Sequence, residues 1–173
     1  GHNGREETTT LTLIPMVKEK IKIPLIAAGG IATGSGMLAA MVLGADGVQM
    51  GSRFAASVES SAHDNFKNTV VNTKEGETQL TLKELAPVRL IKNKFFQEIQ
   101  DLYAQGATKE DLIQLLGRAR AKRGMFEGNL DDGELEIGQI AGLIHKIQPV
   151  HEIIEEIISE FELAQKESAQ WTF

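Results

Sequence analysis

The sequence predicts an α/β fold organised around one β–α–β unit, and three features of residues 23–54 carry this prediction. The run Ile23–Ala28 is short, apolar and followed at once by glycines, as is typical of a buried parallel strand. Gly34–Leu43 then carries apolar residues at helical spacing, and a glycine follows it as a C-terminal cap would. Asp46–Met50 is the second strand. Two strands joined in this way form a right-handed parallel unit.

Glycines come directly after both predicted strands, at Gly29-Gly30 and at Gly51. A residue without a Cβ lets the backbone turn sharply and approach a ligand closely. Exposed amide groups in such turns bind anions. The carboxyl ends of neighbouring strands are also where a (β/α)₈ barrel holds the phosphate of its ligand. The alternative is that these glycines only permit tight turns. A pair of such turns in register favours a phosphate site.

Residues 24–54, PLIAAGGIATGSGMLAAMVLGADGVQMGSRF, resemble the phosphate-binding segment of the nitronate monooxygenase (2-nitropropane dioxygenase) family. That family includes the flavin-dependent enoyl-acyl carrier protein reductases, and its members are FMN-binding TIM barrels. Residues 1–4, GHNG, resemble the end of its glycine-glycine-histidine-x-glycine motif. LAPVR at 85–89 and GQIAG at 138–142 resemble family segments further along. The resemblance covers nearly the whole chain.

The resemblance implies a set of site residues. His2 matches the family histidine that acts at the flavin. The residues implied to bind the cofactor follow the two strands or lie in the later glycine-glutamine segment: Ala28, Gly29, Gly30, Gln49, Met50, Gly51, Ser52 and Gln139. The implied cofactor is FMN, with NAD(P)H as a second cofactor in the reductase members. The implied partners are a small-molecule substrate and, for a reductase, acyl carrier protein. A homodimer is a further expectation.

His2 lies between glycines, so its backbone can follow a tight loop. A neutral imidazole there can accept a proton from a carbon acid, and an imidazolium can donate one. The alternative is that Gly1-His2 was left by cloning, because the chain begins with it. The match of Asn3-Gly4-Arg5 and Thr8-Thr9 to the family context favours the catalytic interpretation.

The length of 173 residues is short for a complete TIM barrel, which needs about 250. The family histidine follows the sixth strand, and only two barrel strands are recognisable after it. We therefore expect the C-terminal part of a (β/α)₈ TIM barrel with an appended helical region. Residues 1–60 would hold the last barrel strands and the FMN phosphate segment, and residues 61–173 a helix-rich region packed on the barrel.

Periodicity and capping patterns predict the remaining elements. The expected helices are Thr10–Lys20, Ser61–Val71, Asn93–Gln105, one from Thr108, Ile137–Ile147 and one from Pro149, with an edge strand at Thr78–Leu82 and a mobile tail from Gln165. In the last helix Ile153, Ile154, Ile157, Ile158 and Phe161 are expected to pack, opposite Glu152, Glu155, Glu156 and Glu160.

Several polar residues have a structural and a functional interpretation. Glu59 is expected to cap a helix or serve a structural role rather than contact a ligand, and His63 is expected on the surface. The basic residues Arg118, Arg120, Lys122 and Arg123 suit a solvated helix face, with a site for an acidic partner as the alternative. Gly124–Gly133 is expected to be a flexible acidic loop without the ligand spacing of a calcium site.

Composition narrows the possible functions. The chain has no cysteine, which removes thiolate catalysis and cysteine-ligated metal centres and fits a cytoplasmic location. The formal charge of −6 argues against a nucleic-acid-binding surface. The apolar runs are far shorter than the ~20 residues that span a bilayer.

Two classes of function remain open. The first is an FMN oxidoreductase that either oxidises alkyl nitronates with oxygen or reduces enoyl thioesters with NAD(P)H. The second is a non-catalytic module that binds a phosphate-bearing ligand and keeps the glycine turns without needing His2. Flavin in the full-length protein would separate the two classes.

Overall fold

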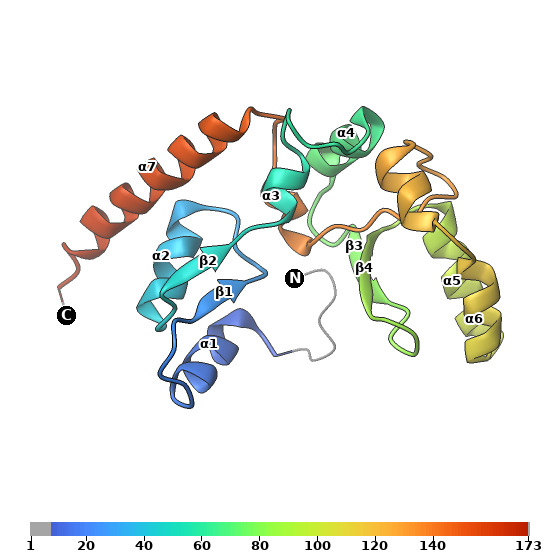
Figure 1. The fold of residues 1–173 in the computed structure, drawn as a ribbon, viewed down its shortest axis with the longest axis horizontal. Helices are drawn as coiled ribbons and strands as arrows, with labels where there is room; N and C mark the ends of the chain where they lie inside the picture. Colours follow the sequence, from blue (N-terminus) through green and yellow to red (C-terminus); the bar gives the residue numbers. More distant parts are fainter. Residues whose placement is uncertain (1–7, 173) are drawn as a thin grey trace.

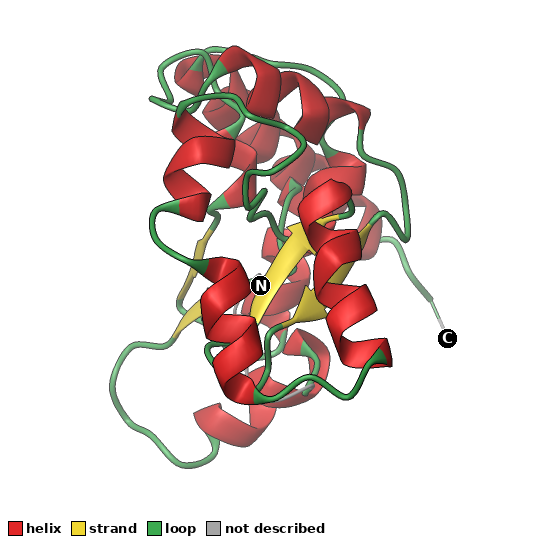
Figure 2. Ribbon diagram, turned by 90° about the vertical axis from the view of Figure 1, so that its right-hand side faces the viewer, coloured by secondary structure: helices red, strands yellow, loops and turns green. Residues whose placement is uncertain are grey.

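The computed structural model describes residues 8–172 as an α/β fold drawn out into an arch (Figure 1). One end of the arch holds a β–α–β unit and the long helix α7 (Val150–Ser168). The other end holds a β-hairpin and a pair of helices. Helices make up most of the regular structure, and the strands are short (Figure 2). His2 lies outside the described residues.

The predicted β–α–β unit is present: β1 (Ile26–Ala28) and β2 (Gly47–Gln49) are parallel neighbours joined by α2 (Gly34–Val42). Both strands are shorter than the apolar runs that predicted them. The side chain of Thr33 caps α2 by accepting a hydrogen bond from the Gly36 amide at 3.1 Å. Helix α1 (Thr10–Lys18) precedes the unit and ends two residues before the predicted end. A small core joins these elements: Ile14, Ala27, Ile31, Ala40 and Ala45.

After β2 the chain forms the short helix α3 (Ser52–Ala55) and then α4 (Asp64–Asn72). The start of α4 lies three residues later than predicted, because His63 is its N-cap and accepts a hydrogen bond from the Asn65 amide. The imidazole is exposed, as predicted. The inward face of α4 belongs to the central core, in which Phe66 is completely buried.

The second sheet is an antiparallel hairpin of β3 (Thr78–Thr81) and β4 (Val88–Ile91). Strand β3 was predicted, whereas β4 was not recognised, because Pro87 and Arg89 break the apolar run that would reveal it. A bridge between Leu90 and Glu136 extends this sheet along its other edge. Helices α5 (Lys94–Ala104) and α6 (Lys109–Leu116) pack beside it, and Thr108 forms the predicted capping box with Asp111.

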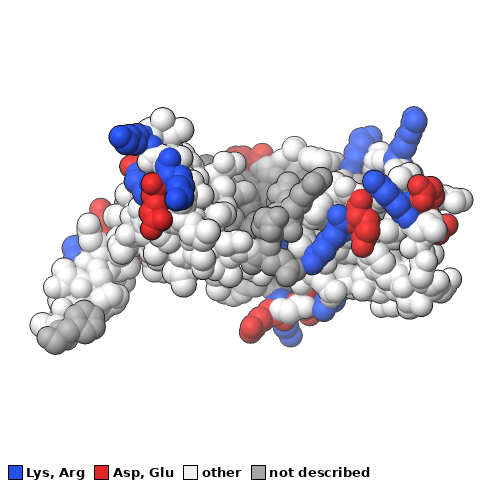
Figure 3. Space-filling model, turned by 90° about the horizontal axis from the view of Figure 1, so that it is seen from below, with Lys and Arg blue, Asp and Glu red and all other residues white. Residues whose placement is uncertain are grey.

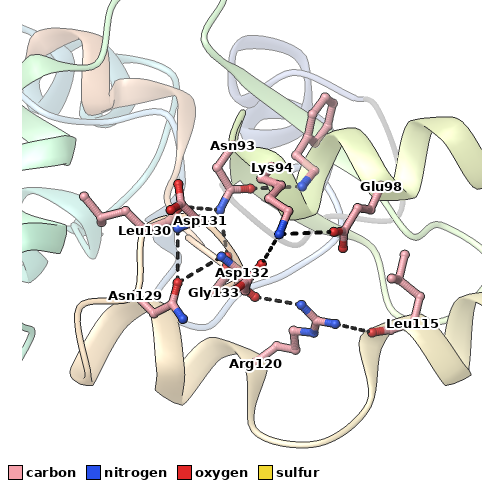
Figure 4. A network of polar contacts seen from close by, with 11 residues as sticks. Asn93, Lys94, Glu98, Leu115, Arg120, Asn129, Leu130, Asp131, Asp132 and Gly133 are labelled. Carbon is pink, nitrogen blue, oxygen red and sulfur yellow. Dashed lines mark hydrogen bonds and ion pairs between the residues drawn. The ribbon is translucent and has the colours of Figure 1, made fainter.

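The basic residues between α6 and the acidic turn do not form a uniformly solvated helix face. Arg120 is half-buried: its guanidinium donates to the carbonyl oxygens of Leu115 and Asp132, both at 2.8 Å, and stacks 4.4 Å from the centre of the Phe95 ring. The expected flexible loop begins as a π-helix, η1 (Lys122–Phe126), and continues as a hydrogen-bonded turn (Figure 4). This basic cluster therefore includes a packing residue.

The two last predicted elements need correction. The helix expected over Ile137–Ile147 is only one 3₁₀ segment, η2 (Gln139–Leu143), after which Ile144 is extended. Glycines before and within this segment weaken a longer helix. The tail expected to be mobile from Gln165 is helical to Ser168, because α7 continues that far.

The prediction for the two faces of α7 was also partly wrong. Ile153 and Ile157 are buried, but Ile154 and Ile158 are exposed. The carboxylates of Glu156 and Glu160, expected on the solvent side, instead contact α3 and α2. The helix is therefore turned so that an isoleucine pair and a glutamate pair share its inward face.

The surface of the β–α–β end carries exposed apolar side chains beside the open edge of β1, including Ile23 and Ile26. Seen from below, charges of both signs are interspersed at the two ends of the molecule (Figure 3). Among residues 8–172, no helix has the length and apolar character that crossing a membrane requires.

Glu134 provides a test of the packing around the hairpin. Its side chain is buried, and burial, followed by the nearby charge of Glu136, raises the pKa of its carboxyl from 4.5 to about 7. The folded protein therefore binds this proton more tightly than the unfolded chain does. This stabilisation is complete below the pKa of Glu134 in the unfolded chain. It is lost as the pH rises through the pKa of Glu134 in the folded protein.

We expect Glu134 to lower the stability of the full-length protein as the pH rises from about 4.5 to about 7, and Glu134→Gln to remove this contribution. Urea unfolding of both proteins across that range measures the effect. Glu110→Gln, on the exposed face of α6, serves as the control. An equal pH slope in the wild type and Glu134→Gln would show that Glu134 titrates normally.

Candidate functional site

The two glycine turns emerge side by side because β1 and β2 run parallel. Ala28, the last residue of β1, is paired in register with Gln49, the last residue of β2. Gly29 and Gly30 both have positive φ, 97° and 76°, so this turn requires glycine. Gly51 has φ −97°, so any residue could adopt its backbone conformation. The second glycine is therefore not required by backbone geometry.

The Cβ position of Gly51 is open in the part of the chain that the structure describes. A Cβ built there would meet no described atom within 4 Å. Ala28, Gly30 and Gln49 are exposed as well. The backbone after both strands therefore lies at the surface of the described residues.

A third segment joins this edge from much later in the chain. The amide of Gly138 donates a 3.0 Å hydrogen bond to the hydroxyl of Ser52, so η2 begins beside the second glycine turn. Gln139 follows and is exposed. Ser52 uses its oxygen as an acceptor in this bond, which leaves its own hydroxyl hydrogen available to a ligand. The structure therefore places Gly138-Gln139 next to Ser52.

Thr10 is a contributor to the site that sequence reasoning missed. Its hydroxyl donates a 3.0 Å hydrogen bond to the carbonyl oxygen of Gly29. This contact fixes the first turn of α1 to the first glycine turn. A threonine at the start of a helix suggests only a local role, so no sequence signal indicated this long-range contact.

Arg53, directly after Ser52, was likewise not predicted to have a role at the site. Its guanidinium is buried and forms a 2.9 Å ion pair with Glu156 of α7. Gln148 bridges the two, since its amide nitrogen donates to Glu156 at 3.0 Å and its oxygen accepts from Arg53 at 3.3 Å. The hydrogen bond from Gln148, and then the charge of Arg53, lower the pKa of the Glu156 carboxyl. Helix α3 is thus tied to α7.

Glu59 has the structural role expected of it. Both of its carboxylate oxygens accept from the amide of Val150, at 2.9 and 3.0 Å, and so cap the start of α7. Because the carboxylate is used in this way, it is not a ligand contact at the glycine turns.

The other candidate sites in residues 8–172 contribute little. No cluster of three or more histidine or acidic side chains there could hold a metal ion. A hollow of about 520 Å³ lies over α4 and the end of β4, lined by polar residues such as Asn65, Asn68 and Asn72. None of the predicted cofactor residues lines it. The glycine edge is therefore the strongest candidate site.

Comparisons with known proteins identify the family of the chain. A family model described as nitronate monooxygenase matches residues 1–160. A probable nitronate monooxygenase of Staphylococcus saprophyticus is 34% identical over an alignment of 170 residues. The match covers 92% of this chain and 47% of that protein. A probable nitronate monooxygenase of Staphylococcus aureus is 42% identical over 91 residues, 52% of this chain and 26% of that protein.

Solved structures are similar over almost the whole chain. FabK from Thermotoga maritima is 39% identical, with a TM-score of 0.87. The match covers 99% of this chain and 54% of the FabK chain. Nitroalkane oxidase from Streptomyces ansochromogenes is 29% identical, with a TM-score of 0.71. The match covers 91% of this chain and 45% of the nitroalkane oxidase chain. The chain thus spans about half the length of these relatives. The chain belongs to the nitronate monooxygenase family.

Proposed function

We propose that this chain is part of an FMN-dependent oxidoreductase that oxidises alkyl nitronates to carbonyl compounds and nitrite with oxygen. The observation that carries the proposal is the pair of glycine turns at the adjacent ends of β1 and β2, with open space over Gly51. That arrangement, in a chain of this family, suits the phosphate of a flavin mononucleotide.

The residues present fit that group. The amides after β1, at Gly29 and Gly30, and after β2, at Gly51 and Ser52, would hold the phosphate together with the Ser52 hydroxyl. The space that a Cβ on Gly51 would fill allows close approach of a phosphate oxygen. Gln139, exposed beside Ser52, would reach the ring or the substrate. Ala28, Gln49 and Met50 would line the same edge.

Bound flavin supplies the electron-transfer chemistry, and the protein supplies orientation, electrostatics and a proton-transfer group. His2 is the residue proposed for that last role. As a neutral imidazole it would accept the α-proton of a nitroalkane, and as an imidazolium it would bind the anionic nitronate. Thr10 would support the phosphate site, because its hydroxyl holds the first glycine turn through the Gly29 carbonyl.

An enoyl-acyl carrier protein reductase that uses NAD(P)H and FMN is the second candidate. The observation that favours it is the similarity to FabK, which is 39% identical over 99% of this chain with a TM-score of 0.87. In this case His2 would act at the thioester end of the substrate, and acyl carrier protein would be the partner. The third candidate is a module that binds a phosphate ligand without catalysis.

Two measurements on the full-length protein separate the candidates. A flavin absorption band in the purified or reconstituted protein is expected for both enzymes, and its absence would leave the non-catalytic module. Oxygen uptake with propionate 3-nitronate is then compared with NAD(P)H oxidation driven by crotonyl thioester. Faster turnover in the first assay supports the nitronate oxidation proposed here, whereas faster turnover in the second assigns the reductase.

The glycine edge can be tested by mutation. Gly51→Val should release FMN while leaving the fold intact, because the side chain fills space that contains no atom of the described residues. Ser52→Ala removes a donor to a charged phosphate and also leaves the Gly138 amide without its partner, so FMN binding should weaken by roughly 1.5–3 kcal/mol. Flavin content and thermal unfolding are measured for both variants. Unchanged flavin in Gly51→Val would place the phosphate elsewhere.

His2 is tested with two substrates in the full-length enzyme. His2→Asn should keep FMN, since the phosphate contacts lie on other segments. Turnover of a neutral nitroalkane should fall by about 10²–10⁴-fold, the usual contribution of a positioned acid–base group. The ionised nitronate should lose much less, because no carbon-bound proton has to be removed. Equal losses would indicate a binding or structural histidine.

A further inference from the structure

We propose that Glu156 and Glu160 of α7 are a pair of positioning residues that set the spacing of the two glycine turns, and so control binding of the ligand phosphate. Each carboxylate holds one of the two segments that follow the turns. The inference rests on the proposed function. It adds a role for a helix that was expected to serve only for packing.

Glu156 holds the segment after the second turn. Its carboxylate oxygen lies 2.9 Å from the guanidinium of Arg53, which is the residue after Ser52. Arg53 is 7% exposed, and Gln148, at 4%, closes the same network. The Glu156 side chain is half-buried, whereas Arg53 without Glu156 would be an uncompensated buried charge, so the ion pair and its additional hydrogen bond hold the Arg53 guanidinium in place. The position of Ser52 is therefore coupled to α7.

Glu160 holds the segment after the first turn. Its carboxylate accepts a 2.7 Å hydrogen bond from the amide of Gly34, the first residue of α2. Gly34 is buried against α7, and a Cβ there would collide with the backbone at Ile157 and Phe161. Helices α2 and α7 therefore meet backbone to backbone at this point. Three residues separate Gly34 from Gly30, so the first turn is also coupled to α7.

The two carboxylates lie on one rigid element. Residues four apart in a helix share a face and are separated along its axis by about 6 Å, at 1.5 Å per residue. Helix α7 is continuous from Val150 to Ser168, so the spacing between Glu156 and Glu160 is fixed. Strands β1 and β2, which precede the two turns, are only three residues long and pair in parallel. The contacts from α7 add to this short ladder in holding the two turns at one spacing.

A ligand phosphate bound by amides of both turns requires those amides at a fixed separation. Neither carboxylate would need to contact the ligand. Glu156 is engaged by Arg53 and Gln148, with Lys146 at 3.7 Å on the exposed side. Glu160 is engaged by the Gly34 amide. Loss of either contact should therefore weaken recognition of the phosphate more than recognition of the rest of the flavin.

The test compares FMN with riboflavin, which lacks the phosphate, in the full-length apoprotein. Glu156→Gln and Glu160→Gln are each titrated with both flavins by fluorescence. Supporting contacts of this kind commonly alter affinity by 10–100-fold, so FMN affinity should fall on the order of tenfold in each variant. Riboflavin affinity should stay within about twofold. The ratio of the two affinities is the readout, because a general loss of folding would lower both.

Asp111→Asn is the control variant. It weakens the capping box with Thr108 at the start of α6, which lies at the end of the molecule away from the glycine turns (Figure 1). The control should leave the FMN-to-riboflavin ratio unchanged. Arg53→Lys keeps a cation for Glu156 and should retain more of the FMN preference than Glu156→Gln does.

The outcomes separate this inference from the proposed function. Wild-type protein that does not prefer FMN over riboflavin overturns the phosphate site itself. If Glu156→Gln and Glu160→Gln keep the wild-type preference for FMN, the positioning role alone is overturned. The same holds if the affinities for both flavins fall equally. Glu156→Gln leaves the buried Arg53 without its ionic partner. If this variant fails to fold, Glu160→Gln decides the result, because Glu160 pairs with a backbone amide and its replacement leaves no buried cation unpaired.

Discussion

The parallel pairing of β1 with β2 is the constraint on which the candidate site depends. A register that joins Ala28 to Gln49 brings the ends of both strands to one edge. Everything else at the site is arranged around that edge: Thr10 holds the first turn, Gly138 contacts Ser52, and α7 holds both following segments. Contacts from distant segments add to this short pairing in holding the edge.

The two glycine turns differ in what the structure explains. The first needs glycine for its backbone, since Gly29 and Gly30 both adopt positive φ. The second has no such need among the described residues, because Gly51 has an ordinary backbone and no described atom lies within 4 Å of its Cβ position. Contacts among the described residues therefore explain the glycines of the first turn but not the glycine of the second.

The helical region from α4 to η2 reaches the glycine edge through Gly138, which contacts Ser52, and through the central core, which also includes Ala32. Arg120, Asn93 and the turn at 129–133 form a network that fastens α5 to the loop before η2 (Figure 4). The chain then runs beside β4, where the Ile137 amide donates a hydrogen bond to the Arg89 carbonyl. The next residue, Gly138, contacts Ser52. The polar network thus sets the path of a segment that reaches the glycine edge.

The sequence by itself determined the β–α–β unit, the two glycine turns and the family, because apolar periodicity and glycine punctuation are local signals. It also predicted the structural role of Glu59. The tertiary structure decided which face of α7 is buried, that Arg53 and Thr10 support the site, and that η2 is short. Those features depend on partners far along the chain: Glu160 bonds to Gly34, and Ser52 to Gly138. A helix pattern shows that glutamates share a face, but only packing against α2 and α3 shows that this face points inward.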